Sequence, residues 1–463
     1  MSLTKVSYSM IQGAVVNILD YGAVADYNEN NPGSGTDNSS AIQAAVDAAN
    51  AKSTNGAVYI PAGAYKILTA ISVPYGVSIF GDGGTATVLH CEGCNGLDFT
   101  TFGYSIGSMF YEDFGLTAST GTNFAAVQSV NSPTSITQDG LNFSRMRFYG
   151  WNQCFVLSST WNTTISTCRA ENINNFATLA QGNGQAVIVK FTNNNINYAS
   201  GGNGTGNKYA IDIVNTTGFT EAVYLSQNSI YGFQICLNID QATFVDIVSN
   251  DFSASVKAIA FVTSAGGYNI SNNYIEVSGS GTGIFGAAQG SETVDTRTSI
   301  QSNYFIGTAT AATGIQLNTA VATYQWNAII RDNTFTGFAG NDILLYSPGK
   351  TLVDNNRCMS TAPTNSIYVG GVGGSLVILT NNYFRKLLYV DVAADFTGGK
   401  LILQNNVENN TFQALKQAVA PTTGTWRVGD IVYNSAPAAA GYIGFVCTVA
   451  GTPGTWNSFG LIA

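Results

Sequence analysis

The sequence is poor in charged residues and in the residues that hold metals. Only 10% of its 463 residues are charged, and it contains one histidine and seven cysteines. Cys91 and Cys94 form a CxxC pair, but no second pair or histidine cluster completes a zinc site. No dense acidic cluster suggests a calcium site either. We therefore expect neither a metal nor a cofactor.

Basic residues and long apolar runs are also scarce. The 18 lysines and arginines are outnumbered by 27 acidic residues, which gives a net charge of −9 and argues against nucleic acid as a partner. No stretch is apolar and long enough to insert in a membrane, and Met1–Asn17 lacks the pattern of a signal peptide. Cys154 and Cys236 are predicted core residues, and the irregular cysteine usage indicates assembly in a reducing cytoplasm.

Long stretches with helical spacing of apolar residues are missing after about Ala51, which disfavours helical repeats. A six-residue phrase recurs instead, as in Ile300–Phe305 (IQSNYF) and Ile330–Phe335 (IRDNTF). It consists of an apolar residue, two polar residues, Asn, one free position and another apolar residue. The Asn stands at positions 194, 228, 250, 273, 303, 333, 356, 382 and 406, in steps of roughly 22 to 34 residues. Periods of this size indicate stacked coils.

Each phrase is typical of a short strand that ends in a turn, because its apolar flanks are mostly β-branched or aromatic. Asn suits a sharp corner, since it tolerates a left-handed backbone and bonds to nearby main chain. Amides at one register can also stack from coil to coil as a ladder. The sequence therefore predicts an all-β parallel β-solenoid in which Asn marks the same corner of every coil.

The two ends of the chain differ from this repeat. Residues 1–16 form a short lead, and residues 17–80 an N-terminal cap. The cap contains a predicted helix at about 38–50, with Asn38 or Ser39 as its N-cap and an apolar face of Ile42, Ala45, Val46 and Ala49. The coils are expected over residues 81–415. Residues 421–463 repeat the tripeptide GTW and predict a small β module for trimerisation or carbohydrate binding.

The segment Asn17–Leu68 resembles the N-terminal signature of the pectate lyase-like superfamily of right-handed parallel β-helices. It runs from a DYGA strand through TDNSSAIQAAVDAA to GAVYIPAGAY, and departs from the common pattern in the insertion Asn28–Gly35. The lead KVSYSMIQGA is similar to the segment ahead of this signature in bacteriophage tailspikes. The resemblance implies a right-handed parallel β-helix that assembles as a homotrimer on a virion tail. Such a protein is made in the host cytoplasm, contacts other tail proteins and binds a bacterial surface polysaccharide.

The corner phrase also predicts which side chains face outwards. Residues four positions before the corner should form one outward column, and residues about six positions before it a second. The first contains Lys190, Tyr224, Asp246, Asn269 and Ser299; the second is expected to hold Ala222, Phe244, Tyr268, Arg297 and Asn327. Aromatic rings, amides and carboxylates on a shallow face suit an oligosaccharide. We expect catalysis by Asp246 with Glu221, with Asp295 as the substitute, and substrate binding by Lys190, Tyr224, Phe244, Tyr268, Asn269 and Arg297.

The type of activity stays open between three alternatives. A carboxylate pair favours glycoside hydrolysis, whereas a lyase would need a base such as Tyr268 with Arg297 or Lys190 with Tyr224. The third alternative is a spike that binds a receptor without catalysis. A secreted plant-wall pectinase is disfavoured by the missing signal peptide and calcium cluster. Apolar residues at the first outward column in later coils, Ile329, Leu352 and Ile378, predict a subunit interface there.

Overall fold

A computed structural model defines the fold, and its described residues divide into two compact units, residues 1–253 and 254–463. Each unit is treated separately below. The structure describes residues 15–31, 33–52, 56–99, 108–119, 124–129, 139–179, 185–198, 209–214, 219–240, 242–263, 266–287, 298–308, 313–318, 326–346, 348–361, 363–370, 376–385, 388–390, 400–408, 411–413, 416–424, 426 and 428–463.

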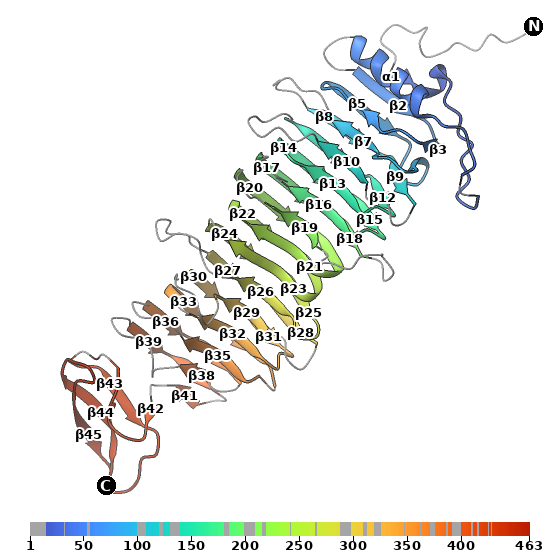
Figure 1. The fold of residues 1–463 in the computed structure, drawn as a ribbon. Coiled ribbons are helices and arrows are strands. Elements are labelled where there is room, and N and C mark those ends of the chain that lie inside the picture. The colour runs from blue at the N-terminus through green and yellow to red at the C-terminus, as the bar shows by residue number, and fades with distance from the viewer. Residues whose placement is uncertain are drawn as a thin grey trace, which may run out of the picture. The chain divides into compact units, whose positions relative to one another are not determined.

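The first unit contains a right-handed parallel β-solenoid (Figure 1). One wall is a parallel sheet whose strands come from successive coils. In order across the sheet these are β1 (Val16–Asn17), β2 (Gly56–Ile60), β5 (Val77–Gly81), β8 (Met109–Glu112), β11 (Leu141–Ser144), β14 (Thr160–Ser166), β17 (Gln185–Thr192), β20 (Phe219–Ser226) and β22 (Ala242–Val248). We call this wall the front sheet. The front sheet begins with β1, which precedes the N-terminal helix in the sequence.

Two further walls of the first unit complete each coil. The wall after the corner contains β3 (Gly63–Ile67), β6 (Thr87–Cys91), β9 (Gly115–Ala118), β12 (Arg147–Tyr149), β15 (Arg169–Glu171), β18 (Asn195–Asn197) and the start of β21 (Ser229–Asp240). The third contains β4 (Ile71–Ser72), β7 (Leu97–Phe99), β10 (Ala125–Ser129), β13 (Gln153–Leu157), β16 (Asn175–Leu179), β19 (Tyr209–Ile213) and the end of β21.

The second unit has the same three walls. Its front sheet contains β24 (Gly266–Ser271), β27 (Thr298–Gln301), β30 (Trp326–Arg331), β33 (Pro348–Asp354), β36 (Leu376–Thr380) and β39 (Lys400–Gln404). The wall after the corner contains β25 (Tyr274–Val277), β28 (Tyr304–Gly307), β31 (Thr334–Thr336), β34 (Arg357–Cys358), β37 (Tyr383–Phe384) and β40 (Asn406–Glu408), the last paired with β41 (Thr411–Gln413). The third contains the end of β23 (Asp251–Thr263), β26 (Thr282–Gly286), β29 (Thr313–Leu317), β32 (Asn341–Tyr346), β35 (Asn365–Gly370) and β38 (Leu388–Val390).

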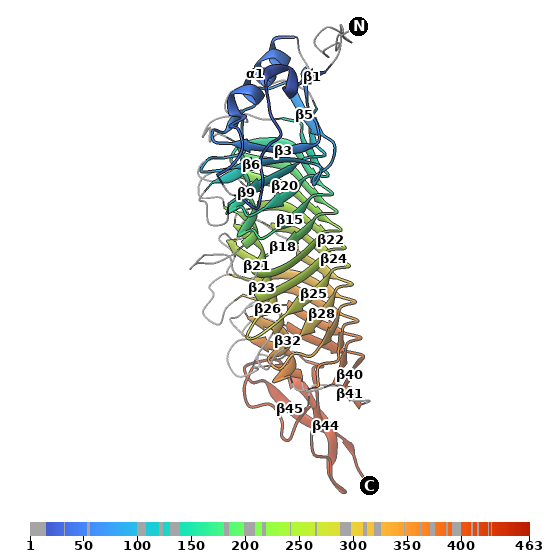
Figure 2. The ribbon, with the colours of Figure 1, turned by 90° about the vertical axis from the view of Figure 1, so that its right-hand side faces the viewer.

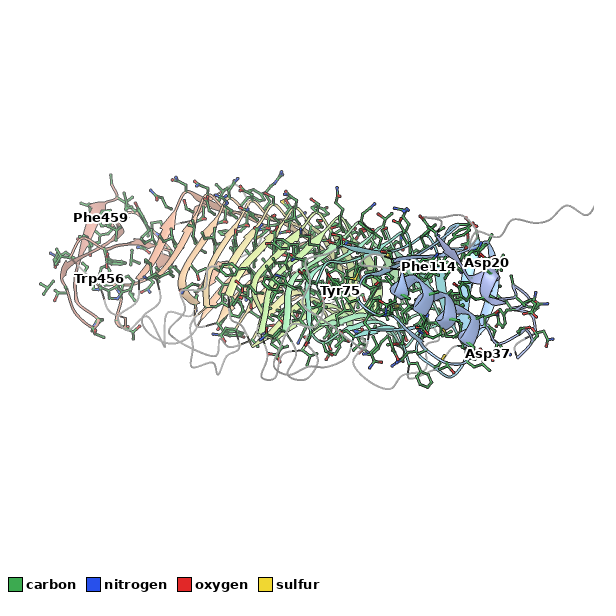
Figure 3. The ribbon with its side chains drawn as sticks, turned by 90° about the horizontal axis from the view of Figure 1, so that it is seen from above. Asp20, Asp37, Tyr75, Phe114, Trp456 and Phe459 are labelled. Carbon is green, nitrogen blue, oxygen red and sulfur yellow. The ribbon has the colours of Figure 1, made fainter. Side chains whose placement is uncertain are left out.

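Helix α1 (Ser39–Ala51) packs against β1 and β2 at the start of the front sheet, next to the short helix η2 (Ile18–Tyr21) (Figure 2). All four residues of its predicted apolar face are buried, which confirms that face. Asn38 is the N-cap, but its side chain bonds to the main chain of Val24 and Thr36 rather than to the helix. The oxygen Oδ1 of Asp37, seen beside the helix in Figure 3, accepts the backbone N–H of Ser39 instead.

The corner of each coil is built from two residues with separate roles. The left-handed backbone conformation belongs to the residue before the corner position, with φ between 51° and 59° from Asp113 to Asn405, and the corner position itself holds Asn from Asn194 onwards. The prediction that Asn itself takes this conformation is therefore wrong. Its side chain instead points inwards and bonds along the stack, as in Asn194 to Asn228 and Asn228 to Asn250, both at 2.9 Å. The predicted amide ladder is confirmed within each unit.

The interior is filled by the residues three and five positions before each corner Asn, which alternate with the predicted outward positions. Val223 and Leu225 of β20 are buried in this way, as are Val245 and Ile247 of β22. Cys154 and Cys236 are fully buried, as predicted. His90 is also buried; its ring stacks on Tyr27 and its Nδ1 lies 2.9 Å from the hydroxyl of Thr117. These contacts agree with a structural role for the histidine.

A separate four-stranded sheet follows near the C-terminus. It consists of β42 (Lys416–Gln417), β43 (Ile431–Asn434), β44 (Tyr442–Val449) and β45 (Thr455–Leu461). Among its described side chains only a few apolar ones, such as Val432 and Cys447, are buried, while Val428 and Leu461 are exposed. So small a sheet leaves much apolar surface in contact with solvent.

Candidate active site

The outward surface of β17, β20 and β22 brings together most of the predicted site residues of the first unit. One column holds Lys190, Tyr224 and Asp246, which pair directly across neighbouring strands. A second column, nearer the start of the same strands, holds Val187, Glu221 and Thr243. Neighbouring strands lie about 4.8 Å apart, so side chains within each column are in contact range. We call this surface the front patch.

A left-handed residue separates the two columns in four successive strands. These residues lie six positions before the corner and have φ between 50° and 58°: Asn162, Ile188, Ala222 and Phe244. The conformation disfavours residues with a Cβ atom, and branched Ile188 most of all. Strain repeated at one place marks a surface whose shape is held by the rest of the fold, and such strain gathers at functional sites. The types of these four residues do not predict a left-handed conformation. The one signal in the sequence is that all four stand at the same distance from the corner.

Two aromatic side chains stand out from the front patch. Tyr224 is 39% exposed and Phe244 is 62% exposed, which is unusual for a phenylalanine in a sheet. Phe244 stands six positions before its corner, at an outward position, and its ring is directed to solvent. Exposed ring faces beside carboxylates and an ammonium group provide stacking surfaces for the C–H faces of sugar rings.

The carboxylates of the front patch lie on a diagonal. Glu221 belongs to β20 and Asp246 to the next strand, three register positions further along. Three strand positions and one strand spacing place their Cα atoms at most about 11 Å apart, because the left-handed residue between the columns shortens each strand. Both side chains face outwards and can lean together across the gap. This arrangement suits a pair with room for a water molecule, as in inverting glycosidases at about 6.5–9.5 Å, better than a pair at about 5–5.5 Å.

Four other predicted site residues lie elsewhere. Asn269 belongs to the second unit, where it pairs with Ser299 in the corresponding column. Asp295 and Arg297 lie outside the described residues. The prediction that Tyr268 faces outwards is wrong: it is 1% exposed and its ring stacks on Phe261, with centroids 4.4 Å apart. Tyr268 stands five positions before Asn273, which is an inward position, so it is unable to contact a sugar.

No cluster of three or more His, Cys, Asp or Glu side chains that could hold a metal occurs in the described part of the chain. Among the same residues, no helix combines the length and the apolar character needed to cross a lipid bilayer.

The two tryptophans of the C-terminal GTW tripeptides, Trp426 and Trp456, pack edge to face, with ring centroids 5.0 Å apart. Each indole N–H donates to the carbonyl three residues earlier, at 2.8 Å to Thr423 and 3.0 Å to Pro453. Figure 3 shows Trp456 together with Phe459 on this sheet. The repeated tripeptide thus forms the same local turn twice, and the two indole rings pack against each other.

A sequence model of the family described as rhamnogalacturonase A/epimerase, pectate lyase-like, matches residues 15–285. This match includes the N-terminal signature, helix α1 and the whole front patch. No curated protein sequence matches the chain.

Several solved β-helix structures are similar to this fold at low sequence identity. The catalytic unit of an α-1,3-glucanase from Streptomyces thermodiastaticus is 14% identical, with a TM-score of 0.51 over 87% of this chain and 70% of its own. The A-module of the mannuronan C-5 epimerase AlgE6 from Azotobacter vinelandii is 16% identical, with a TM-score of 0.49 over 85% and 98%. Tailspike protein 3 of bacteriophage CBA120 is 13% identical, with a TM-score of 0.43 over 99% and 72%.

Proposed function

The chain belongs to the rhamnogalacturonase A/epimerase, pectate lyase-like family, and from this premise we propose that it binds and cleaves a polysaccharide. The proposed substrate is a bacterial surface polysaccharide, capsule or O-antigen, and the proposed setting is a phage or prophage tailspike. The lead segment and the N-terminal signature support the setting. The front patch supports the substrate class, because it combines carboxylates, an ammonium group and exposed aromatic rings.

The single observation that carries the proposal is the register of Tyr224 with Asp246, beside the strained and exposed Phe244. A sugar ring stacked on Phe244 or Tyr224 would place its glycosidic oxygen over the gap between Glu221 and Asp246. Lys190, next to Tyr224 in its column, would attract acidic groups on the sugar. This local positive charge would offset the repulsion between an acidic polysaccharide and a protein with a net charge of −9.

The proposed reaction is glycoside hydrolysis with inversion. One carboxyl group protonates the leaving oxygen, and the other activates a water molecule on the opposite face of the sugar. The diagonal separation of Glu221 and Asp246 leaves room for this water. A protein with these two groups needs no metal for the reaction.

We also propose that the protein acts as a homotrimer. In the second unit the outward column of the front sheet becomes apolar, with Ile329, Leu352, Ile378 and Ile402 paired in sequence. The C-terminal sheet exposes further apolar residues, including Val428 and Leu461. Association of copies through these surfaces would remove apolar area from water.

Helix α1 would cover the first coil and prevent edge pairing there.

Incubation with purified host capsule or lipopolysaccharide tests the function. New reducing ends without ultraviolet absorbance from unsaturated uronates support the hydrolase. New absorbance from unsaturated sugars would assign a lyase instead. Binding without any product would leave a receptor-binding spike and contradict the proposed cleavage.

A further inference from the structure

A pair of thiols lies in the first unit, away from the front patch. Cys91 ends strand β6, and Cys94 follows in the turn after it. Gly93, with φ of 70° and no atom within 4 Å of where its Cβ would be, lets the chain reverse at an open surface. The Sγ atom of Cys94 lies 3.6 Å from the carbonyl oxygen of Ile67, the residue that pairs with Cys91. The turn therefore brings the second thiol back over the first.

The two thiols are hydrogen-bonded to each other but differ in access. Cys91 is fully buried, whereas Cys94 is partly exposed. The hydrogen bond from the Cys91 thiol lowers the pKa of Cys94. The same hydrogen bond, together with burial, raises the pKa of Cys91. Cys94 is partly exposed and has the lower pKa, as expected of an attacking cysteine. Cys91 is buried beside it, as expected of the resolving cysteine that closes the disulfide.

The other cysteines do not share this arrangement. All seven lie in the described residues, and Cys94 alone is not buried. Cys154 and Cys168 also lie near each other, but both are buried and burial raises the pKa of both thiols. Because neither of these two thiols is exposed, an oxidant in solution has no accessible sulfur to react with in this pair. They provide an internal control in the same chain.

We propose that Cys91 and Cys94 form a redox site in which Cys94 reacts with a low-molecular-weight disulfide and Cys91 then closes an intramolecular disulfide. The Cys94 thiolate attacks one sulfur of the oxidant, and the first thiolate leaves. The Cys91 thiol loses its proton and attacks the Sγ atom of Cys94, and the second thiolate leaves. Two protein thiols are thus oxidised to one disulfide while one molecule of oxidant is reduced to two thiols.

The disulfide would fix the turn that carries Glu92. The Oε1 atom of Glu92 accepts the backbone N–H of Gly33 at 3.3 Å, and its Oε2 lies 4.0 Å from Nζ of Lys66. Lys66 in turn donates to the carbonyl of Gly33 at 3.0 Å. Glu92 and Lys66 therefore hold Gly33, which belongs to the inserted segment Asn28–Gly35, against the first coils. A disulfide between Cys91 and Cys94, which flank Glu92, would stiffen the contact of Glu92 with Gly33 when the protein leaves a reducing cytoplasm.

The test begins with the reduced, folded full-length chain and glutathione disulfide, followed by alkylation and peptide mass analysis. The wild type should lose two hydrogen atoms in the peptide containing both cysteines and lose its alkylation at Cys94. Cys91→Ser should retain glutathione on Cys94, Cys94→Ser should not react, and Cys154→Ser should behave as wild type. Two free thiols in the wild type after excess oxidant, or an unmodified Cys94 in Cys91→Ser, would overturn the redox site.

Hydrogen exchange tests the attachment of the loop in the wild-type chain, so it does not depend on any variant folding. Residues 28–36 should exchange more slowly in the oxidised than in the reduced protein. Equal exchange in the two forms would refute the stiffening of the loop.

Discussion

Asn303 donates its side-chain amide to the side-chain oxygen of Asn333 on the next coil, over 3.0 Å. Its own oxygen accepts both the backbone and the side-chain N–H of Asn273, each at 2.9 Å, and its second amide hydrogen goes to the carbonyl of Ile270 at 2.9 Å. The side chain of a buried Asn has two donor and two acceptor positions, and Asn303 uses all four.

Removing this side chain should therefore be costly. Asn303→Ala leaves several buried polar groups without a partner, and we expect the free energy of unfolding to fall by about 3 kcal/mol or more. Asn303→Asp should also destabilise the protein, because a carboxylate is unable to donate either hydrogen bond. Urea unfolding measures the change. Ser302→Gly, at the exposed left-handed position next to it, is the control and should not lower stability, because glycine takes φ of 57° without strain. A similar loss in the control would contradict the special role of the ladder.

The ladder also shows how far the sequence predicts this fold. A fixed spacing of Asn with apolar flanks was enough to predict coils, their register and the neighbours Tyr224 and Asp246. It was not enough to place the left-handed residue, because that position is exposed and accepts residues as different as Arg145 and Thr167. The left-handed conformation of Phe244 could not be predicted from the sequence for another reason. Phenylalanine disfavours this backbone, so only the surrounding coils, and not the residue, determine it.

Both carboxylates of the front patch should be essential for cleavage. Glu221→Gln and Asp246→Asn keep the size of each side chain but remove proton transfer, and we expect kcat to fall by about 10²–10⁴-fold with little change in substrate binding. Release of reducing ends measures the rate. Asp47→Asn, on the exposed face of α1, is the matched control and should keep full activity. Full activity in either site variant would remove that residue from the mechanism.

Phe244 should separate sugar binding from stability. Both Phe244→Ala and Phe244→Gly remove the stacking ring, and we expect each to weaken polysaccharide binding by about tenfold, as loss of about 1.4 kcal/mol implies. Phe244→Gly should nevertheless be more stable than Phe244→Ala by about 1 kcal/mol, because glycine takes φ of 55° without strain. This order is the reverse of the usual one in strands. Titration calorimetry and urea unfolding would measure the two effects, and a less stable glycine variant would contradict the strain.

The apolar column of the second unit should carry self-association. Leu352→Asp places a charge between Ile329 and Ile378, with which Leu352 pairs on either side. If copies meet through this column, the charge would be desolvated on association, and sedimentation should show a shift from trimer to monomer. Ser299→Asp, in the same column two strands earlier than Leu352, is the control and should leave the mass unchanged. A trimer that persists in Leu352→Asp would place the interface elsewhere.

A buried carboxyl group should make the stability of the second unit depend on pH. Asp342 of β32 is fully buried; its Oδ1 accepts a hydrogen bond from the hydroxyl of Ser360, and Oδ2 has no partner among the described residues. Burial raises its pKa from an ordinary value of 3.8 to about 7. The neighbouring titratable group is Cys358, which is buried as well.

The sign follows from proton binding. Between pH 3.8 and about 7 the folded chain keeps the proton on Asp342 while the unfolded chain has lost it, so stability falls as pH rises through this range and then levels off. At about 1.4 kcal/mol for each unit of pKa, the effect is about 4 kcal/mol at most. Asp342→Asn retains an acceptor for Ser360 but has no charge to bury. Its unfolding free energy should therefore lose this pH dependence and exceed that of the wild type at pH 8. Parallel curves for the two proteins in urea between pH 4 and 8 would contradict the raised pKa, because an ordinary carboxyl group would already be ionised in both states across that range.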